Sequence, residues 1–133
     1  MVHITEENML DTLRGIIEER GENYVYEGSD ESDSCLYVHQ VNGDLVPGCL
    51  VGTALHRLGV PLQTMTWHEG ASAHGLLRRL TKIGVIEGGA DHIAFALNEA
   101  QAYQDKGSSW GYALRIYERR MHELKFEENH EPE

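Results

Sequence analysis

The dipeptide Asn42-Gly43 constrains the fold most, because it stands between two stretches of strand-like composition. Residues 36–41 and 44–46 are rich in Leu, Val and Tyr. Asn-Gly accepts the positive φ angles that both central positions of a type I′ turn require. We therefore predict a β-hairpin over residues 36–46, which places antiparallel β structure in the first half of the chain.

Stretches with helical periodicity surround this hairpin. Thr5 is a suitable N-cap for a helix that Gly21 ends, and Ser72 is a suitable N-cap for a helix that Gly84 ends. The helix after Ser72 is expected to turn Leu76, Leu77, Leu80 and Ile83 to the core. In total, the predicted helices cover residues 6–20, 49–58, 72–83, 98–106 and 108–124.

A second hairpin is expected between the later helices. Residues 85–86 and 92–96 have strand composition and flank the turn-prone residues 87–89. The order helix, hairpin, helices, hairpin, helices predicts the α+β class, with about five helices packed on small antiparallel β-hairpins in a single compact domain. This domain is expected to cover residues 1–124, and the acidic tail, residues 125–133, is expected to fray.

Charge is unevenly distributed along the chain. The 133 residues carry 11 Lys and Arg against 22 Asp and Glu, a formal net charge of -11. Residues 1–46 hold 11 acids and 2 bases, residues 47–122 hold 6 and 8, and residues 123–133 hold 5 and 1. Because an acidic chain repels nucleic acid unless a local basic face compensates, nucleic acid is an unfavoured partner.

The sequence also lacks the marks of membrane insertion and secretion. No apolar run approaches the roughly 20 residues of a membrane span. Residues 1–4 lack the basic and apolar regions of a signal peptide. Cys35 and Cys49 are too few for a disulfide framework and are expected to be reduced thiols. We therefore expect a cytoplasmic protein with no membrane partner.

Cys49 is one candidate catalytic residue, because it begins a predicted helix, where backbone N–H groups and the helix dipole favour a thiolate. Residues 49–62 resemble the nucleophile helix of papain-like peptidoglycan amidases, and residues 92–95 resemble their His-bearing strand. That resemblance implies a cysteine hydrolase in which Cys49 attacks and His92 acts as base. The alternative is that Cys49 is a small apolar residue buried at a helix start.

A basic helix face supports a different hypothesis. Residues 72–96 resemble the recognition helix and wing of a winged-helix DNA-binding regulator, in which Arg78, Arg79 and Lys82 would contact phosphates or base edges. The acidic net charge argues against this reading. The alternative is a solvated helix face above a core.

The histidines, the acidic loop and the aromatics complete the candidate sites. His68, Glu69 and His74 lack the i, i+4 spacing of a strong zinc motif, so neither a metal nor another cofactor is expected. The protein-binding candidates are the carboxylates Asp30, Glu31 and Asp33, which could meet a basic partner, and Tyr112, which is expected to be exposed. Trp110 and Tyr117 share a helix face and are expected to be core residues.

Six segments carry a further resemblance: residues 23–26, 35–38, 47–52, 55–60, 100–101 and 104–107, together with Trp110. As a set they resemble a group of small acidic proteins found in actinobacteria and their bacteriophages. The resemblance implies an accessory protein that acts in the host bacterial cytoplasm, and it implies no catalytic residue. We therefore expect a non-enzymatic phage-type protein that binds a host or phage protein, with a homo-oligomer as an open possibility.

Overall fold

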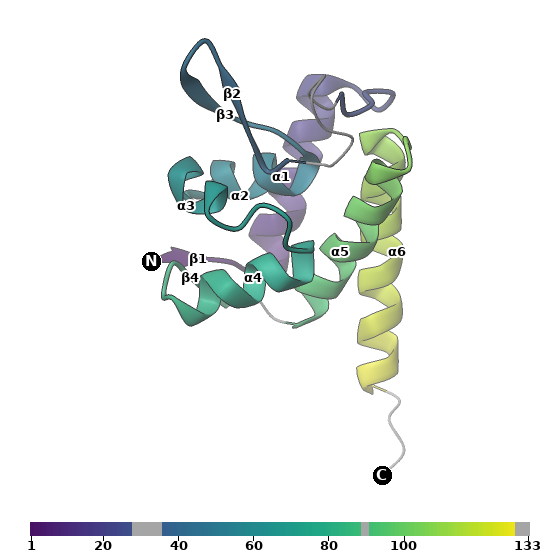
Figure 1. Cartoon of the computed structure of the whole chain (residues 1–133). Helices are drawn as coiled ribbons and strands as arrows, with labels where there is room; N and C mark the ends of the chain where they lie inside the picture. The colour runs from purple at the N-terminus through teal and green to yellow at the C-terminus, as the bar shows by residue number, and fades with distance from the viewer. Residues whose placement is uncertain (28–35, 89–90, 130–133) are drawn as a thin grey trace.

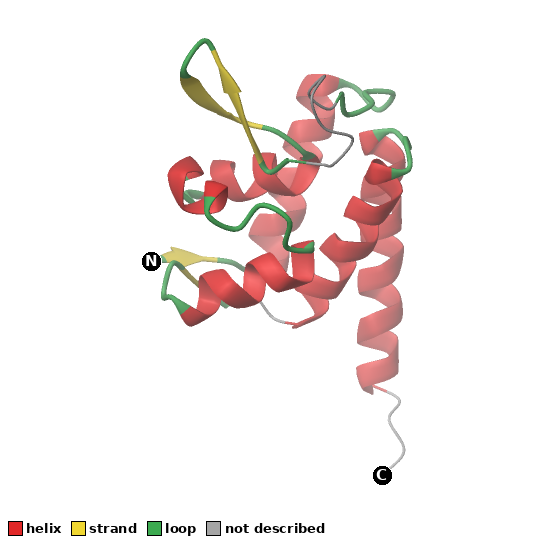
Figure 2. Ribbon diagram, viewed as in Figure 1, coloured by secondary structure: helices red, strands yellow, loops and turns green. Residues whose placement is uncertain are grey.

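The computed structural model describes residues 1–27, 36–88 and 91–129. Its helices and strands alternate irregularly, and the predicted α+β class is confirmed (Figure 2). In chain order they are β1 (Val2–His3), α1 (Glu6–Arg20), β2 (Val38–Val41), β3 (Asp44–Pro47), α2 (Leu50–Leu58), α3 (Leu62–Thr66), α4 (Ala73–Lys82), β4 (Ile86–Glu87), α5 (Asp91–Asp105) and α6 (Trp110–Asn129). None of the helices in these described ranges has the length and apolar character needed to span a membrane.

The core forms where the helices pack on one another. α5 packs along α6 and also contacts α4, while α1 contacts both α2 and α6. The C-terminal part of α6 extends past the other helices, and the β2–β3 hairpin projects at the opposite end of the molecule (Figure 1). The hairpin and the C-terminal part of α6 therefore both extend beyond the central core, at opposite ends of the molecule.

Helix α1 forms as predicted. Its N-cap Thr5 and Asn8 make a reciprocal capping box: the Asn8 N–H donates to Thr5 Oγ1 at 3.0 Å, and the Thr5 N–H donates to Asn8 Oδ1 at 2.9 Å. The apolar residues at helical spacing, Met9, Leu13, Ile16 and Ile17, are buried. The sequence therefore predicted the bounds of this helix correctly.

The first hairpin is also confirmed, with Val38 paired to Pro47 and Val41 paired to Asp44. Asn42 and Gly43 have φ angles of 51° and 86°, as a type I′ turn requires. The chain just before β2 lies directly against α2, since a Cβ atom on Gly52 would come within 2.1 Å of the carbonyl oxygen of Tyr37. Glycine at this position lets the hairpin base pack on the helix.

The second predicted hairpin is wrong. Residues 92–96 belong to helix α5, and β4 instead pairs in parallel with β1, Val2 opposite Ile86 and His3 opposite Glu87. Over a short window, residues 92–96 have the apolar composition of a buried strand. Over the longer window, Ile93, Leu97, Ala100 and Gln104 follow helical spacing and are buried, and this longer pattern determines the structure.

Two smaller predictions, the burial of Ile83 and the end of the last helix, are also wrong. Ile83 is 54% exposed because α4 ends at Lys82, so the helical face that buries Leu76 and Leu80 does not continue to it. Helix α6 continues to Asn129, beyond its predicted end at residue 124. Lys125 contributes to that extension, since its Nζ pairs with the Glu6 carboxylate of α1 at 3.2 Å.

Candidate functional site

Two tyrosines meet where the C-terminal end of α5 faces the start of α6. Gly107, with a φ of 98°, reverses the chain between the helices. The rings of Tyr103 and Tyr112 then contact edge to face, with centroids 5.6 Å apart and planes at 67°. Tyr112 is 40% exposed, as the sequence predicted, and Tyr103 is half-buried beside it. The result is an aromatic surface built from two adjacent helices.

Two cations border this aromatic surface. Lys106 Nζ lies 5.4 Å from the ring centroid of Tyr103, and the guanidinium carbon of Arg115 lies 5.9 Å from that of Tyr112. Both are cation–π distances. We refer to Tyr103, Lys106, Tyr112 and Arg115 as the tyrosine patch. In a chain of net charge -11, this patch combines exposed aromatic surface with local positive charge.

Three contacts stabilise the helix ends that carry the patch. The indole Nε1–H of the buried Trp110 donates to Gln104 Oε1 at 3.1 Å, and the Tyr24 ring packs edge-on against Trp110 with centroids 4.5 Å apart. The Tyr112 N–H donates to Ser109 Oγ at 3.1 Å. These contacts fix the backbone of the two helix ends that carry the tyrosines.

Only part of the predicted protein-binding set can be placed. Tyr112 lies in the tyrosine patch, whereas Asp30, Glu31 and Asp33 lie outside the described residues. The sequence placed Tyr103 among the aromatic residues of the two C-terminal helices, but its contact with Tyr112 was not predicted. The signal was the glycine stop at Gly107: two helices that reverse there bring residues on either side of the turn together.

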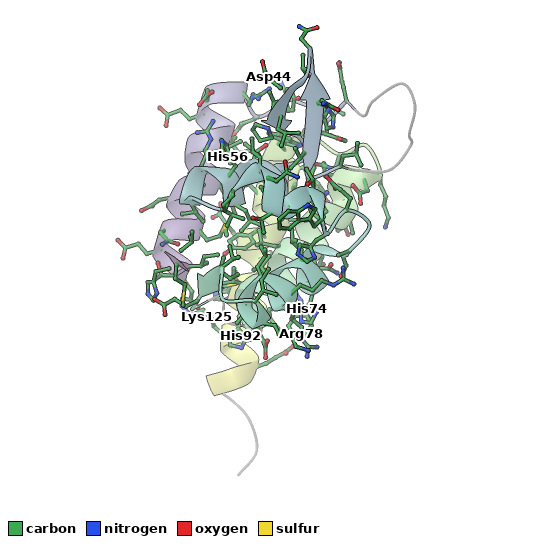
Figure 3. All side chains as sticks on the ribbon, turned by 60° about the vertical axis from the view of Figure 1, so that its left-hand side comes forward. Asp44, His56, His74, Arg78, His92 and Lys125 are labelled. Carbon is green, nitrogen blue, oxygen red and sulfur yellow. The ribbon has the colours of Figure 1, made fainter. Side chains whose placement is uncertain are left out.

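The structure does not bring the proposed catalytic pair together. Cys49 is fully buried as the N-cap of α2, and the next residue, Leu50, donates its N–H to Gln104 near the C-terminal end of α5. His92 lies near the N-terminal end of α5. At 1.5 Å per residue it is about 18 Å from Gln104 along the helix axis. In Figure 3, His92 lies at the opposite end of the molecule from Asp44 of the hairpin. Cys49 therefore fits the alternative reading, a small buried residue.

Arg78, Arg79 and Lys82 are exposed on α4, as the sequence suggested. Arg78 and Lys82 border a hollow of about 260 Å³ between α4 and the start of α5, which the Asp91 carboxylate also lines. The wing expected after this helix does not form, because α5 occupies its residues. The predicted winged-helix arrangement is therefore wrong. The basic face of α4 is present, but the wing that would contact DNA beside it is not formed by residues 92–96.

Glu69 has a structural role at the base of the hairpin. Its two carboxylate oxygens accept hydrogen bonds from the N–H groups of Tyr37 at 2.8 Å and Val38 at 3.0 Å. Burial raises the pKa of this carboxyl above its ordinary value, opposed by the two backbone hydrogen bonds and by the charge of His39. Beside it, His39 Nε2 is 2.5 Å from the Tyr26 hydroxyl. Glu69 thus attaches the hairpin to the segment after α3.

The remaining histidines do not gather into a ligand set. His74 stacks on Phe95 of α5 with ring centroids 4.4 Å apart, whereas Glu69, five residues before it, bonds to the base of the hairpin. Within residues 1–27, 36–88 and 91–129, no group of three or more His, Cys, Asp or Glu side chains is placed to hold a metal ion. The tyrosine patch therefore remains the arrangement with the clearest chemical character, an aromatic surface with a cationic border.

Comparison of the chain with models of protein families, with curated proteins and with solved structures found no match.

Proposed function

We propose that the protein is a non-enzymatic accessory protein that binds another protein through the tyrosine patch. The observation that supports this most directly is the contact between Tyr103 and Tyr112 at the exposed end of α5 and α6. Tyrosine and arginine are enriched in the small sets of residues that dominate binding free energy at protein interfaces. A fixed pair of tyrosines beside Arg115 has this composition.

The border of the patch indicates the chemistry of the partner. Lys106 and Arg115 are exposed, lie over the two tyrosine rings, and form no ion pair with the residues that the structure describes. Carboxylates on a partner would gain charge-assisted hydrogen bonds there. We therefore propose a partner surface that carries acidic side chains around an apolar centre. The proposal also includes the cellular setting that the sequence resemblance implies, which is the cytoplasm of an actinobacterium carrying a phage.

The proposal is tested by parallel affinity capture with the wild-type protein and two variants. Tyr112→Ala removes the exposed ring of the patch. Trp67→Ala removes a ring that is 70% exposed at the end of α3, on the other side of the molecule from the turn between α5 and α6 (Figure 1). A partner that binds the patch is recovered by the wild type and by Trp67→Ala but not by Tyr112→Ala. If every captured protein binds all three equally, the patch is not the interface.

Single-stranded nucleic acid also stacks on aromatic rings beside cations, so it is a named outcome of the same test. A labelled oligonucleotide is titrated against the wild-type protein at low salt. Salt-sensitive binding that Tyr112→Ala abolishes would contradict protein binding as the function of the patch. The acidic net charge leads us to expect no binding.

A further inference from the structure

A pocket of about 470 Å³ lies between the first turns of α1 and the C-terminal half of α6, at the opposite end of α6 from the tyrosine patch. Its apolar walls come from Leu10, Met121 and Phe126, and Tyr117 also lines it. Glu6 and Lys125 stand at its rim and pair at 3.2 Å. Cavities of roughly 300–1,000 Å³ with mainly apolar walls are typical of small-molecule sites.

Tyr117 supplies the second observation. Its side chain is 2% exposed, and its hydroxyl has no hydrogen-bond partner among the residues that the structure describes. Buried hydroxyls are normally satisfied, and the equally buried Tyr37 shows the usual case, because its hydroxyl donates to the carbonyl oxygen of Ala71. The unpartnered hydroxyl of Tyr117 therefore indicates an acceptor that comes from outside the chain.

The protonation state of Tyr117 and the charges around the pocket indicate which kind of ligand carries this acceptor. Burial, and in second place the charge of Glu6, raise the pKa of Tyr117, so its hydroxyl stays protonated and can donate. At the mouth, Lys125 neutralises Glu6, and Arg14 lies 3.5 Å from Glu118. The carboxylates and the ammonium group that line the pocket are therefore each paired, and His122 is the other polar side chain of the lining beside Tyr117. Paired charges favour an uncharged ligand.

We propose that this α1–α6 pocket binds a small, uncharged, mainly apolar ligand that accepts a hydrogen bond from the Tyr117 hydroxyl. The apolar body of the ligand lies against Leu10, Met121 and Phe126. The Tyr117 hydroxyl is covered in the ligand-free structure, so binding requires a neighbouring side chain to move. Met121 lines the pocket and is unbranched, and we assign this movement to it. This site is separate from the tyrosine patch, and its test does not depend on the proposed protein partner.

The test uses the neutral dye 6-propionyl-2-dimethylaminonaphthalene, which has an apolar ring system and one carbonyl acceptor. Its emission moves to shorter wavelength in an apolar environment, and the dye is titrated with the full-length protein. We expect a saturable blue shift. Tyr117→Phe should weaken binding about threefold to tenfold, since one neutral hydrogen bond is lost. Phe126→Ala should also weaken it, and the distant Trp67→Ala should leave it unchanged.

Phe126 is 57% exposed, so its replacement tests the pocket without disturbing the core. Circular dichroism of each variant verifies that it is folded. The proposal is overturned if the wild type gives no saturable shift, or if neither Tyr117→Phe nor Phe126→Ala changes the affinity. If only Phe126→Ala weakens binding, the assignment of Tyr117 as the donor is wrong.

Discussion

Gln104 Oε1 accepts a hydrogen bond from the backbone N–H of Leu50 at 2.9 Å, although the two residues are 54 positions apart in the chain. The same oxygen accepts from the indole N–H of Trp110 at 3.1 Å. One buried amide thus satisfies the first turn of α2 and the first residue of α6. It links the hairpin end of the molecule to the helices that carry the tyrosine patch.

Replacing Gln104 should therefore cost more stability than its size suggests. Gln104→Leu leaves two buried donors without an acceptor, and each unsatisfied group costs about 1–3 kcal/mol. We expect the free energy of unfolding, measured by urea denaturation, to fall by about 2–6 kcal/mol. Gln40→Leu is the matched control, because Gln40 is exposed on β2 and its replacement should stay within about 0.5 kcal/mol of wild type. Equal effects of the two changes would contradict this role of Gln104.

Two glycines should respond to alanine in opposite directions. A Cβ atom at Gly52 would come within 2.1 Å of the Tyr37 carbonyl oxygen, whereas one at Gly15 would meet nothing within 4 Å. We expect Gly52→Ala to lower the free energy of unfolding by about 1–3 kcal/mol through overpacking. Gly15→Ala, inside α1, should raise it by about 0.5–1 kcal/mol. Thermal and urea denaturation of both variants measure the difference, and a stable Gly52→Ala protein would show that the hairpin base does not lie on α2.

Removing a hydroxyl should also have opposite effects at two buried tyrosines. Tyr37→Phe loses the hydrogen bond to Ala71 and should cost about 1 kcal/mol of stability. Tyr117→Phe removes a buried hydroxyl that has no partner in the described part of the chain, so it should leave stability unchanged or raise it by up to about 1–2 kcal/mol. The comparison uses the ligand-free protein in urea. A loss of more than about 1 kcal/mol in Tyr117→Phe would mean that the hydroxyl is satisfied within the protein.

Stability should depend on pH through Glu69. Burial raises the pKa of its carboxyl above the ordinary 4.5, so the folded state holds this proton more tightly than the unfolded state. The stabilisation from Glu69 is therefore fully present below about pH 4.5 and is lost as the pH rises through the folded-state pKa. The difference in free energy of unfolding between wild type and Glu69→Gln should move in favour of wild type as the pH falls from neutrality.

Urea denaturation at several pH values measures this difference, with the exposed Asp11→Asn as a control for the loss of one surface carboxylate. A trend of the opposite sign would show that the hydrogen bonds from Tyr37 and Val38 outweigh burial and lower the pKa of Glu69.

The local parts of the fold could be predicted from the sequence, because their signals lie within a few residues. Thr5 and Asn8 cap α1 through neighbouring atoms, and Asn42 and Gly43 determine the turn by their own φ angles. The pairing of β1 with β4 could not be predicted in this way. Each strand has two residues, too few to show an alternating pattern, and the pair joins Val2 to Ile86 across most of the chain.

The candidate site was predicted only at Tyr112. Its exposure followed from helical spacing relative to Trp110, which faces the core. The contribution of Tyr103 depends on how α5 and α6 pack, and that packing depends on the buried Gln104 and on the turn at Gly107. A polar residue such as Gln104 is expected at the surface, so its buried hydrogen bond with Trp110 could not be predicted from the hydrophobic pattern.

The central claim, that the tyrosine patch binds an acidic protein surface, is tested most directly by one ratio of dissociation constants. With the captured partner purified, calorimetric titration compares Tyr112→Ala with the control Trp67→Ala. We predict that Tyr112→Ala binds at least about 30-fold more weakly, as expected when a residue contributing about 2 kcal/mol is removed from an interface. Equal dissociation constants for the two variants would contradict the account.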